Sequence, residues 1–132
     1  MSATPDDCAH LSIDTVREIH AEAIKRFGGL NGVRDENLLA SAVLTPQSSF
    51  GGKSPYADTV EVAAAYLFCI CNNYPFLDGN KRTAMYAMAA WLEREGYAIE
   101  AERGELRDLA LTIASHGISL EQIAAWLEQR SK

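Results

Sequence analysis

Residues 58–96 read DTVEVAAAYLFCICNNYPFLDGNKRTAMYAMAAWLEREG and hold two nearly apolar segments on either side of a short loop. A helix that is apolar on almost every side is buried inside a protein, so each segment predicts a central helix. The first helix starts near Asp58 and Glu61, which have the spacing of a capping box. The second runs from about Asn80 and has Gly96 as its expected C-cap. We therefore expect two buried helices at the centre of the molecule.

Shorter amphipathic helices are expected on both sides of this pair. One starts after the N-cap Ser12 and stops at Gly28. The next is capped by Asp35 and ends near Pro46, because proline disfavours a helix at the residue before it. Two more helices follow a brief extended piece at 97–99. Their signals are Leu106, Leu109, Ala110 and Ile113, ending near His116 and Gly117, and then the capping box Ser119 and Gln122 with Ile123, Trp126 and Leu127.

The length and the patterning of the chain define its fold class. A chain of 132 residues has the usual size of one compact domain, and a hydrophobic content of 48% is ordinary for a globular protein. No alternating strand pattern, internal repeat, low-complexity tract or linker is apparent in the sequence. We therefore expect an all-α fold, a compact single-domain helical bundle over residues 1–132, with residues 1–11 as a flexible N-terminus.

Composition excludes several classes of protein. The net charge of −6 removes the general electrostatic attraction to nucleic acid, so phosphate binding must come from a local basic cluster. The acidic start of the chain is no secretory signal, and no apolar run spans a bilayer without breaks, which predicts a cytoplasmic protein away from membranes. The three cysteines, Cys8, Cys69 and Cys71, are poorly spaced for a zinc clamp or a disulfide and are expected to be reduced, structural thiols.

The segment from Asp78 to Arg82 carries an acid, a glycine, an amide and two cations between the two central helices. The unpaired N–H groups and the positive dipole at a helix start form an anion nest, to which Asn80, Lys81 and Arg82 add donors, while Asp78 is suited to Mg²⁺. The alternative is a solvated first turn that Asp78 merely caps. The dipole disfavours two adjacent cations here, which indicates an anion, but the residues alone leave both interpretations open. Phe76, an apolar ring between helices, is expected to anchor the loop in the core.

The run from Pro75 to Thr83, Pro-Phe-Leu-Asp-Gly-Asn-Lys-Arg-Thr, resembles the signature of the Fic/Doc family, in which His-Pro-Phe-x-Asp-Gly-Asn is followed by Lys-Arg in the Doc branch. Every position agrees except the first, where Tyr74 stands in place of the histidine. The resemblance covers nearly the whole chain and implies the compact helical fold of that family. Its further matching positions are Gly28-Gly29-Leu30, Arg34-Asp35-Glu36 and Glu95-Gly96-Tyr97.

The resemblance also implies a nucleotide site and a reaction. By it, Asp78 is the Mg²⁺ ligand, and Gly79, Asn80 and Arg82 hold the phosphates of ATP. Lys81 stands where Fic adenylyltransferases usually have glycine, and a lysine there accompanies kinase activity in the Doc branch, which binds ATP reversed. The Doc branch further implies a toxin that phosphorylates a threonine of elongation factor Tu and arrests translation. A Phd-like antitoxin is the implied neutralising partner.

Tyr74 departs from the pattern, because the histidine of the family is the general base for the target hydroxyl. A free phenol has a pKa of about 10, against about 6.5 for imidazole, so tyrosine is a poor base at neutral pH. We predict strongly reduced transfer. Tyr74 is either a substitution made to produce a toxin safely or the residue of a natural member that binds without catalysing. A weakened Doc kinase, a Fic adenylyltransferase and a nonenzymatic pseudoenzyme that binds nucleotide or antitoxin all stay open.

Three other features bear on the site. His20 lies on the apolar face of the first helix and is expected to be a hydrogen-bonded core residue. His116, beside a helix end, is expected to cap the last carbonyls with its imidazole. The loop from Ser48 to Tyr56 corresponds in position to the target-docking flap of the family, and its composition indicates only flexibility.

Overall fold

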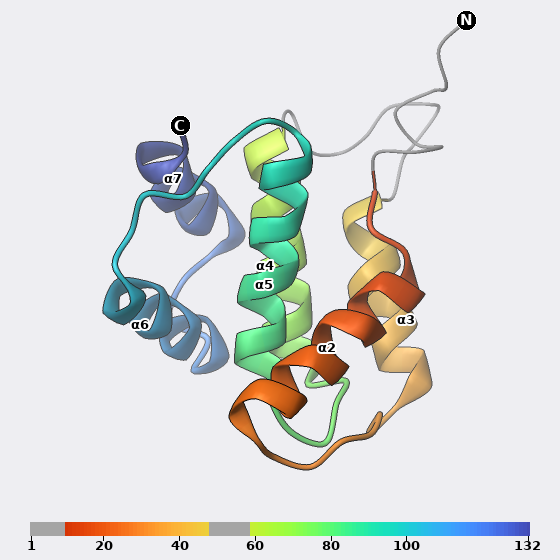
Figure 1. Ribbon diagram of the computed structural model, residues 1–132. Coiled ribbons are helices and arrows are strands. Elements are labelled where there is room, and N and C mark those ends of the chain that lie inside the picture. The colour runs from red at the N-terminus through yellow and green to blue at the C-terminus, as the bar shows by residue number, and fades with distance from the viewer. Residues whose placement is uncertain (1–9, 48–58) are drawn as a thin grey trace, which may run out of the picture.

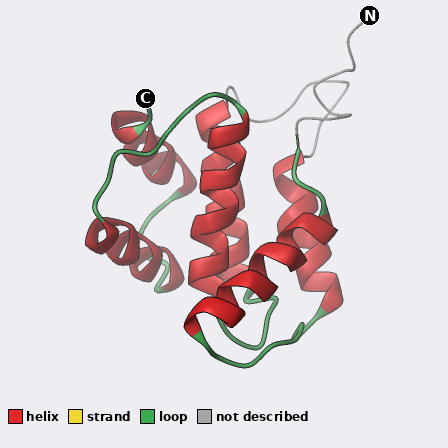
Figure 2. Ribbon diagram, in the orientation of Figure 1, coloured by secondary structure: helices red, strands yellow, loops and turns green. Residues whose placement is uncertain are grey.

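The computed structural model describes residues 10–47 and 59–132. Within those ranges the chain forms six α-helices, and Figure 2 shows helices joined by loops with no strand between them. The expected all-α fold class is confirmed. The elements are α2 (Ile13–Phe27), α3 (Glu36–Leu44), the 3-10 turn η1 (Thr45–Gln47), α4 (Thr59–Asn73), α5 (Asn80–Arg94), α6 (Arg103–Ala114) and α7 (Leu120–Arg130).

Helices α4 and α5 form the centre of the molecule, with α2 and α3 on one side and α6 and α7 on the other (Figure 1). The buried residues of α4 include Tyr66, Leu67 and Ile70, each 0% exposed. Side chains from all the described α-helices join one buried cluster around them. The pair of buried central helices that residues 58–96 predict is therefore confirmed. None of the described helices is long and apolar enough to cross a membrane.

The side chains expected to begin the flanking helices do so. The Ser12 hydroxyl and the Asp35 carboxylate each accept a hydrogen bond from a backbone N–H of the first turn. Ser119 and Gln122 form the reciprocal bonds of a capping box. These contacts satisfy donors that a helix cannot pair by itself. Asp58, expected to begin α4, lies outside the described residues.

Residues with positive φ follow several of the described helices, among them α5 and α6. Glu95 is the C-cap of α5, and Gly96, with a φ of 90°, follows it, one position beyond the cap expected for the glycine. The N–H of Tyr97 then donates to the carbonyl of Leu92 (2.8 Å), as in a Schellman motif. His116 has the corresponding place after α6, with a φ of 61°. It closes the helix through its backbone N–H, which corrects the expected imidazole cap.

The described part of the N-terminal segment is attached to the core. Of residues 1–11, expected to be flexible, the structure describes His10 and Leu11. Leu11 is buried, and its N–H donates to the Oη of Tyr66 on α4 (3.0 Å). Burial raises the pKa of Tyr66 to about 12, so this hydroxyl stays protonated at any physiological pH.

Two of the cysteines lie on the central helix α4. Cys69 and Cys71 are free thiols, and burial raises the pKa of Cys69 to about 11 and that of Cys71 to about 12. Thiols of such high pKa are protonated and unreactive at neutral pH, in agreement with a structural role. Cys8 lies outside the described residues.

Candidate active site

The loop between α4 and α5 is held by the segment that joins α2 to α3. Val33 and Phe76 pair as an isolated antiparallel bridge. Next to it, the N–H of Arg34 donates to the carbonyl of Pro75 (2.7 Å). Because these bonds join backbone to backbone, they fix the path of the loop whatever its side chains do. The loop and the α2–α3 connection, far apart in the sequence, therefore form one structural unit.

Phe76 and His20 form the buried support of this unit. Phe76 is 2% exposed, and its ring stacks on the imidazole of His20 with the centroids 3.8 Å apart and the planes at 4°. The Nε2 of His20, itself 2% exposed, donates to the backbone carbonyl of Asp78 (2.8 Å). The prediction of a hydrogen-bonded core histidine is confirmed. His20 thus contacts the loop from the core side, through the carbonyl of Asp78. The buried ring of Phe76 attaches the loop to His20 by stacking.

Asp78 is exposed beside the start of α5. Its Oδ1 accepts a hydrogen bond from the N–H of Gly79 (3.0 Å), and its Oδ2 accepts one from the N–H of Leu30 (3.2 Å). Two backbone donors therefore orient the carboxylate, and each oxygen keeps lone-pair capacity for a cation. Gly29 makes this approach possible: at its φ of 115°, an added Cβ would lie only 2.8 Å from Oδ2.

The first turn of α5 starts at Gly79, which has a φ of 75° and no side-chain cap. Asn80 turns its amide back into the loop, where Oδ1 accepts from the N–H of Phe76 (2.9 Å) and Nδ2 donates to the Phe76 carbonyl (3.0 Å). No side chain of the described residues caps this turn, so the N–H groups after Gly79 keep the capacity to bind an anion. The Asn80 amide, expected on a phosphate, stabilises the loop in this conformation.

The two cations of this turn have different surroundings. Lys81 is half-buried. Arg82 is exposed, and its guanidinium carbon lies 4.0 Å from the centroid of the Phe27 ring, a cation–π contact. The next residue, Thr83, is 0% exposed, and its hydroxyl has no hydrogen-bond partner among the described residues. Both charges lie within one helical turn of Asp78, so the structure brings the predicted acid and cations together.

Tyr74, at the end of α4, adopts a strained backbone conformation with a φ of 47°. Its side chain is 37% exposed, and its Oη donates to the backbone carbonyl of Ala114 at the end of α6 (3.2 Å). The phenol is therefore attached to a neighbouring helix. The position that the family gives to a histidine lies at the edge of the same loop as Asp78.

Arg34 contacts the candidate site, a role that the sequence alone did not predict. Its Nε donates to the carbonyl of Tyr74 (2.6 Å), and its Nη2 donates to the carbonyl of Asn73 (2.7 Å). One guanidinium thus pairs two carbonyls that the end of α4 leaves unsatisfied, and a cation suits the negative end of the helix dipole. No local pattern around Arg34 predicts a contact forty residues away. Its only signal was its place in the family resemblance.

The donors present fit Mg²⁺ that arrives with a nucleotide. Among the described residues, no group of three or more His, Cys, Asp or Glu side chains could hold a metal ion by itself. Mg²⁺ commonly binds through one or two carboxylates, several waters and the phosphates of a substrate. The single oriented carboxylate of Asp78 meets that need, and the cations of the first turn would neutralise the remaining phosphate charge.

Comparison with known proteins agrees with this geometry. The pattern of the Fic/DOC family matches residues 10–92, and the chain belongs to that family. Protein kinase doc of Escherichia phage P1 is 31% identical over 120 residues, which cover 91% of this chain and 94% of the relative. Toxin Doc of Mycolicibacterium smegmatis is 38% identical over 105 residues, 76% of this chain and 79% of the relative. The resemblance to the Doc branch is thereby confirmed.

Gly29→Ala should displace the carboxylate of Asp78. The new Cβ meets Oδ2 at 2.8 Å and also forces an alanine to a φ of 115°. We expect a loss of about 1 to 3 kcal/mol in the free energy of unfolding, measured by urea denaturation. Gly28→Ala is the matched control, since its φ is also positive at 84° but a Cβ there meets nothing within 4 Å. Equal losses of stability in Gly29→Ala and Gly28→Ala would show that the contact of the new Cβ with Asp78 adds nothing to the backbone strain.

Proposed function

We propose that the chain is a Doc-type protein kinase and the toxin of a toxin–antitoxin pair, with its transfer step weakened by Tyr74. The observation that carries the proposal is the carboxylate of Asp78, held by two backbone N–H groups beside the cationic start of α5. The names of the two relatives, a protein kinase and a toxin, support the reaction class and the biological role.

Each residue has a part in the proposed reaction. Asp78 would hold Mg²⁺, which neutralises phosphate charge and helps to align the phosphates when bound. The first-turn N–H groups of α5, together with Lys81 and Arg82, would bind and orient the phosphates of ATP. Phosphoryl transfer needs such alignment and charge neutralisation more than covalent participation by the protein. This chain supplies both from a contiguous loop and helix start.

Lys81 favours phosphoryl transfer over adenylylation. A Fic adenylyltransferase usually has glycine at this position, whereas the additional cation suits the reversed ATP of the Doc branch, in which the γ-phosphate is transferred. The proposed target is a threonine of elongation factor Tu in the cytoplasm, and the proposed partner is a Phd-like antitoxin that folds on binding. Adenylylation and a purely binding role are the outcomes that a product analysis separates from this one.

Arg82→Ala should weaken the binding of Mg-ATP. A charge-assisted contact to phosphate contributes about 1.5 to 3 kcal/mol, so the dissociation constant should rise roughly tenfold or more. Isothermal calorimetry on the unaltered chain and on Arg82→Ala measures this directly. Arg26→Ala is the matched control, because Arg26 is also exposed and lies on α2, where it pairs with Glu22 (3.4 Å). Equal affinity of Arg82→Ala and the unaltered chain would contradict the phosphate role.

Toxicity should depend on residue 74 and on an antitoxin. Cells that express Tyr74→His should stop growing, cells that express the unaltered chain should grow, and co-expression of the cognate antitoxin should restore growth of the former. The reason is that only the histidine form has an efficient general base. Growth curves after induction measure the effect, and immunoblots check that the unaltered chain and Tyr74→His are present in equal amounts. Normal growth with abundant Tyr74→His protein would argue strongly against a toxin.

A further inference from the structure

The end of α4 differs from the ends of α5 and α6, although a residue with positive φ follows each of these helices. After α6, the N–H of Gly117 donates to the carbonyl of Thr112 (2.9 Å), and Tyr97 makes the corresponding bond after α5. This bond belongs to the Schellman motif, which closes a helix around a left-handed residue. After α4 the residue with positive φ is Tyr74, and it is followed by Pro75, which has no N–H. The Schellman bond therefore cannot form at the end of α4.

Pro75 also opposes the conformation of Tyr74. A residue with a side chain seldom adopts a positive φ, and the φ of Tyr74 is 47°. The residue before a proline is in addition pushed toward extended conformations of negative φ. Two local preferences are thus overcome at Tyr74, so a contact from outside the segment has to hold its backbone.

Arg34 supplies this contact. Its Nε donates to the carbonyl of Tyr74 (2.6 Å), and its Nη2 donates to the carbonyl of Asn73 (2.7 Å). These two carbonyls belong to the peptide groups before and after the Cα of Tyr74, and φ and ψ of Tyr74 describe how the two groups are oriented. A planar guanidinium that binds both carbonyls therefore restrains the backbone of Tyr74 directly.

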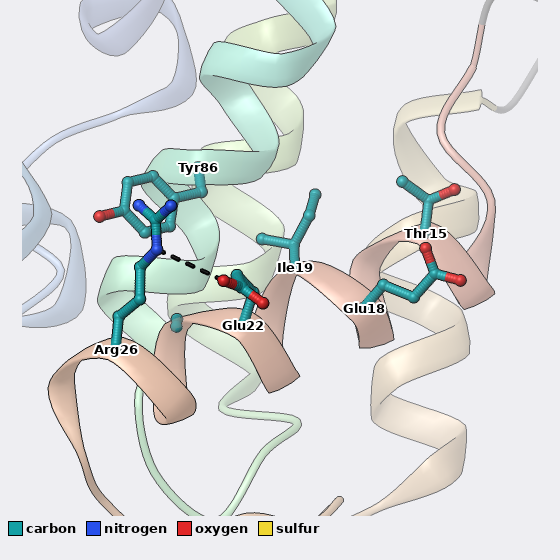
Figure 3. A pocket seen from close by; sticks show the side chains of 7 residues that line it. Thr15, Glu18, Ile19, Glu22, Arg26 and Tyr86 are labelled. Atoms are coloured by element: carbon teal, nitrogen blue, oxygen red, sulfur yellow. Dashed lines mark ion pairs between the residues drawn. The ribbon is translucent and has the colours of Figure 1, made fainter.

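Arg26 is an exposed arginine with a different kind of partner. It lies on α2 and pairs with the carboxylate of Glu22 on the same helix (3.4 Å), as Figure 3 shows. An exposed pair of residues four positions apart contributes little to stability. Arg34 instead binds backbone carbonyls of a distant segment, through two short, charge-assisted bonds. Arg26 is therefore a matched control for the removal of an exposed guanidinium.

The conformation of residue 74 determines where its side chain points. The direction of a side chain depends on the backbone that carries it, so a change in φ would move the ring. At the observed φ, the Oη of Tyr74 reaches the end of α6 and donates to the carbonyl of Ala114 (3.2 Å). We propose that Arg34 is a positioning residue, which holds residue 74 at positive φ and thereby sets the direction of its side chain. Its catalytic consequence rests on the proposed function: Arg34 would orient the general base of the Tyr74→His form.

Nuclear magnetic resonance tests the positioning role without any activity. At positive φ the amide proton lies close to the Hα of the same residue, so Tyr74 should give a strong nuclear Overhauser cross-peak between these protons. The cross-peak should lose about half or more of its intensity in Arg34→Ala and in Arg34→Lys, since lysine keeps the charge but lacks the planar group that binds both carbonyls. Arg26→Ala should leave it unchanged. Full intensity in both Arg34 variants would overturn the proposal.

A second substitution tests why Arg34 is needed. Pro75→Ala supplies the missing N–H and removes the restriction on residue 74, so a Schellman bond to the carbonyl of Ile70 can form. When Pro75→Ala is added to Arg34→Ala, the cross-peak of Tyr74 should return to its original intensity. If it did not return, Arg34 would not replace this bond, and the proposal would be wrong. Circular dichroism checks that each variant is folded, and Arg34→Lys decides the first test if Arg34→Ala does not fold.

The catalytic consequence is measured in the Tyr74→His form. Adding Arg34→Ala should lower the single-turnover rate of phosphoryl transfer about tenfold or more, because a displacement of about 1 Å in an active site can cost roughly a hundredfold. The dissociation constant of Mg-ATP should stay within about twofold, since Arg34 contacts the end of α4 and not the start of α5.

The outcomes separate the positioning role from the proposed function. An unchanged transfer rate would overturn the orientation of the base by Arg34, and so would an affinity for Mg-ATP that falls as much as the rate, because that result indicates a general loss of structure. Adding Arg26→Ala to Tyr74→His should change neither quantity. A Tyr74→His form that is itself inactive would overturn the proposed function, and the spectra of Tyr74 would then decide the positioning role alone.

Discussion

Tyr74→His should turn a nearly inert chain into an active kinase, with a rise of about 10² to 10⁴ in the rate of transfer, the range typical of a general base. The rise is expected because an imidazole at position 74 can act as a general base at neutral pH, whereas the phenol of tyrosine is a poor one. The hydroxyl of Tyr74 donates to the carbonyl of Ala114, so its proton is already in a hydrogen bond within the chain. An imidazole is shorter, and free imidazole has a pKa of about 6.5, so it can accept a threonine proton at neutral pH.

Single-turnover assays on elongation factor Tu with γ-labelled and α-labelled ATP test this expectation. Label should come only from the γ position and only with Tyr74→His, and mass spectrometry should find phosphothreonine. Tyr74→Phe is the matched control, because it removes the bond to Ala114 without adding a base and should stay inert. Transfer from the α position would show an adenylyltransferase. Equal rates for Tyr74→His and Tyr74→Phe would mean that residue 74 does not act as the base.

The fold was largely predictable because its signals are local. Ser12, Asp35 and Ser119 lie next to the donors that they cap, so a short window of sequence contains both partners. The burial of α4 follows from a helix that is apolar on most sides. The errors arose at helix ends. His116 ends α6 through its backbone N–H, with a positive φ. A histidine side chain does not predict a positive φ, so this helix end could not be read from the sequence.

The site was predictable only in part. Residues 78–82 are contiguous, so their chemistry could be read as a group. The contacts that position them come from elsewhere, since Leu30 orients Asp78 and Arg34 pairs the end of α4. Such contacts depend on how the helices pack, which a single sequence does not encode locally. The amide of Asn80 illustrates the same limit, because its bonds to the loop backbone depend on the loop geometry.

Phe76→Ala should be the most destabilising change in the loop. The ring is 2% exposed and stacks on His20 at 3.8 Å, so its removal loses buried apolar surface and leaves a cavity beneath the loop. Truncation of a buried phenylalanine costs about 3 to 5 kcal/mol in the free energy of unfolding. That loss is a large part of the roughly 5 to 15 kcal/mol that stabilises a typical domain. Urea denaturation followed by circular dichroism measures it.

Leu77→Ala supplies the matched control for Phe76→Ala, because the two residues are neighbours in the same loop. Leu77 is 52% exposed, so its truncation removes little buried surface and should change the free energy of unfolding by no more than about 1 kcal/mol. Phe76→Leu should fall between the two, since a branched aliphatic side chain refills part of the cavity but cannot stack on His20. If Phe76→Ala and Leu77→Ala lowered stability equally, Phe76 would not be the anchor of the loop. A large loss in Phe76→Ala, an intermediate loss in Phe76→Leu and a small loss in Leu77→Ala would show that the buried ring supports the fold of the loop.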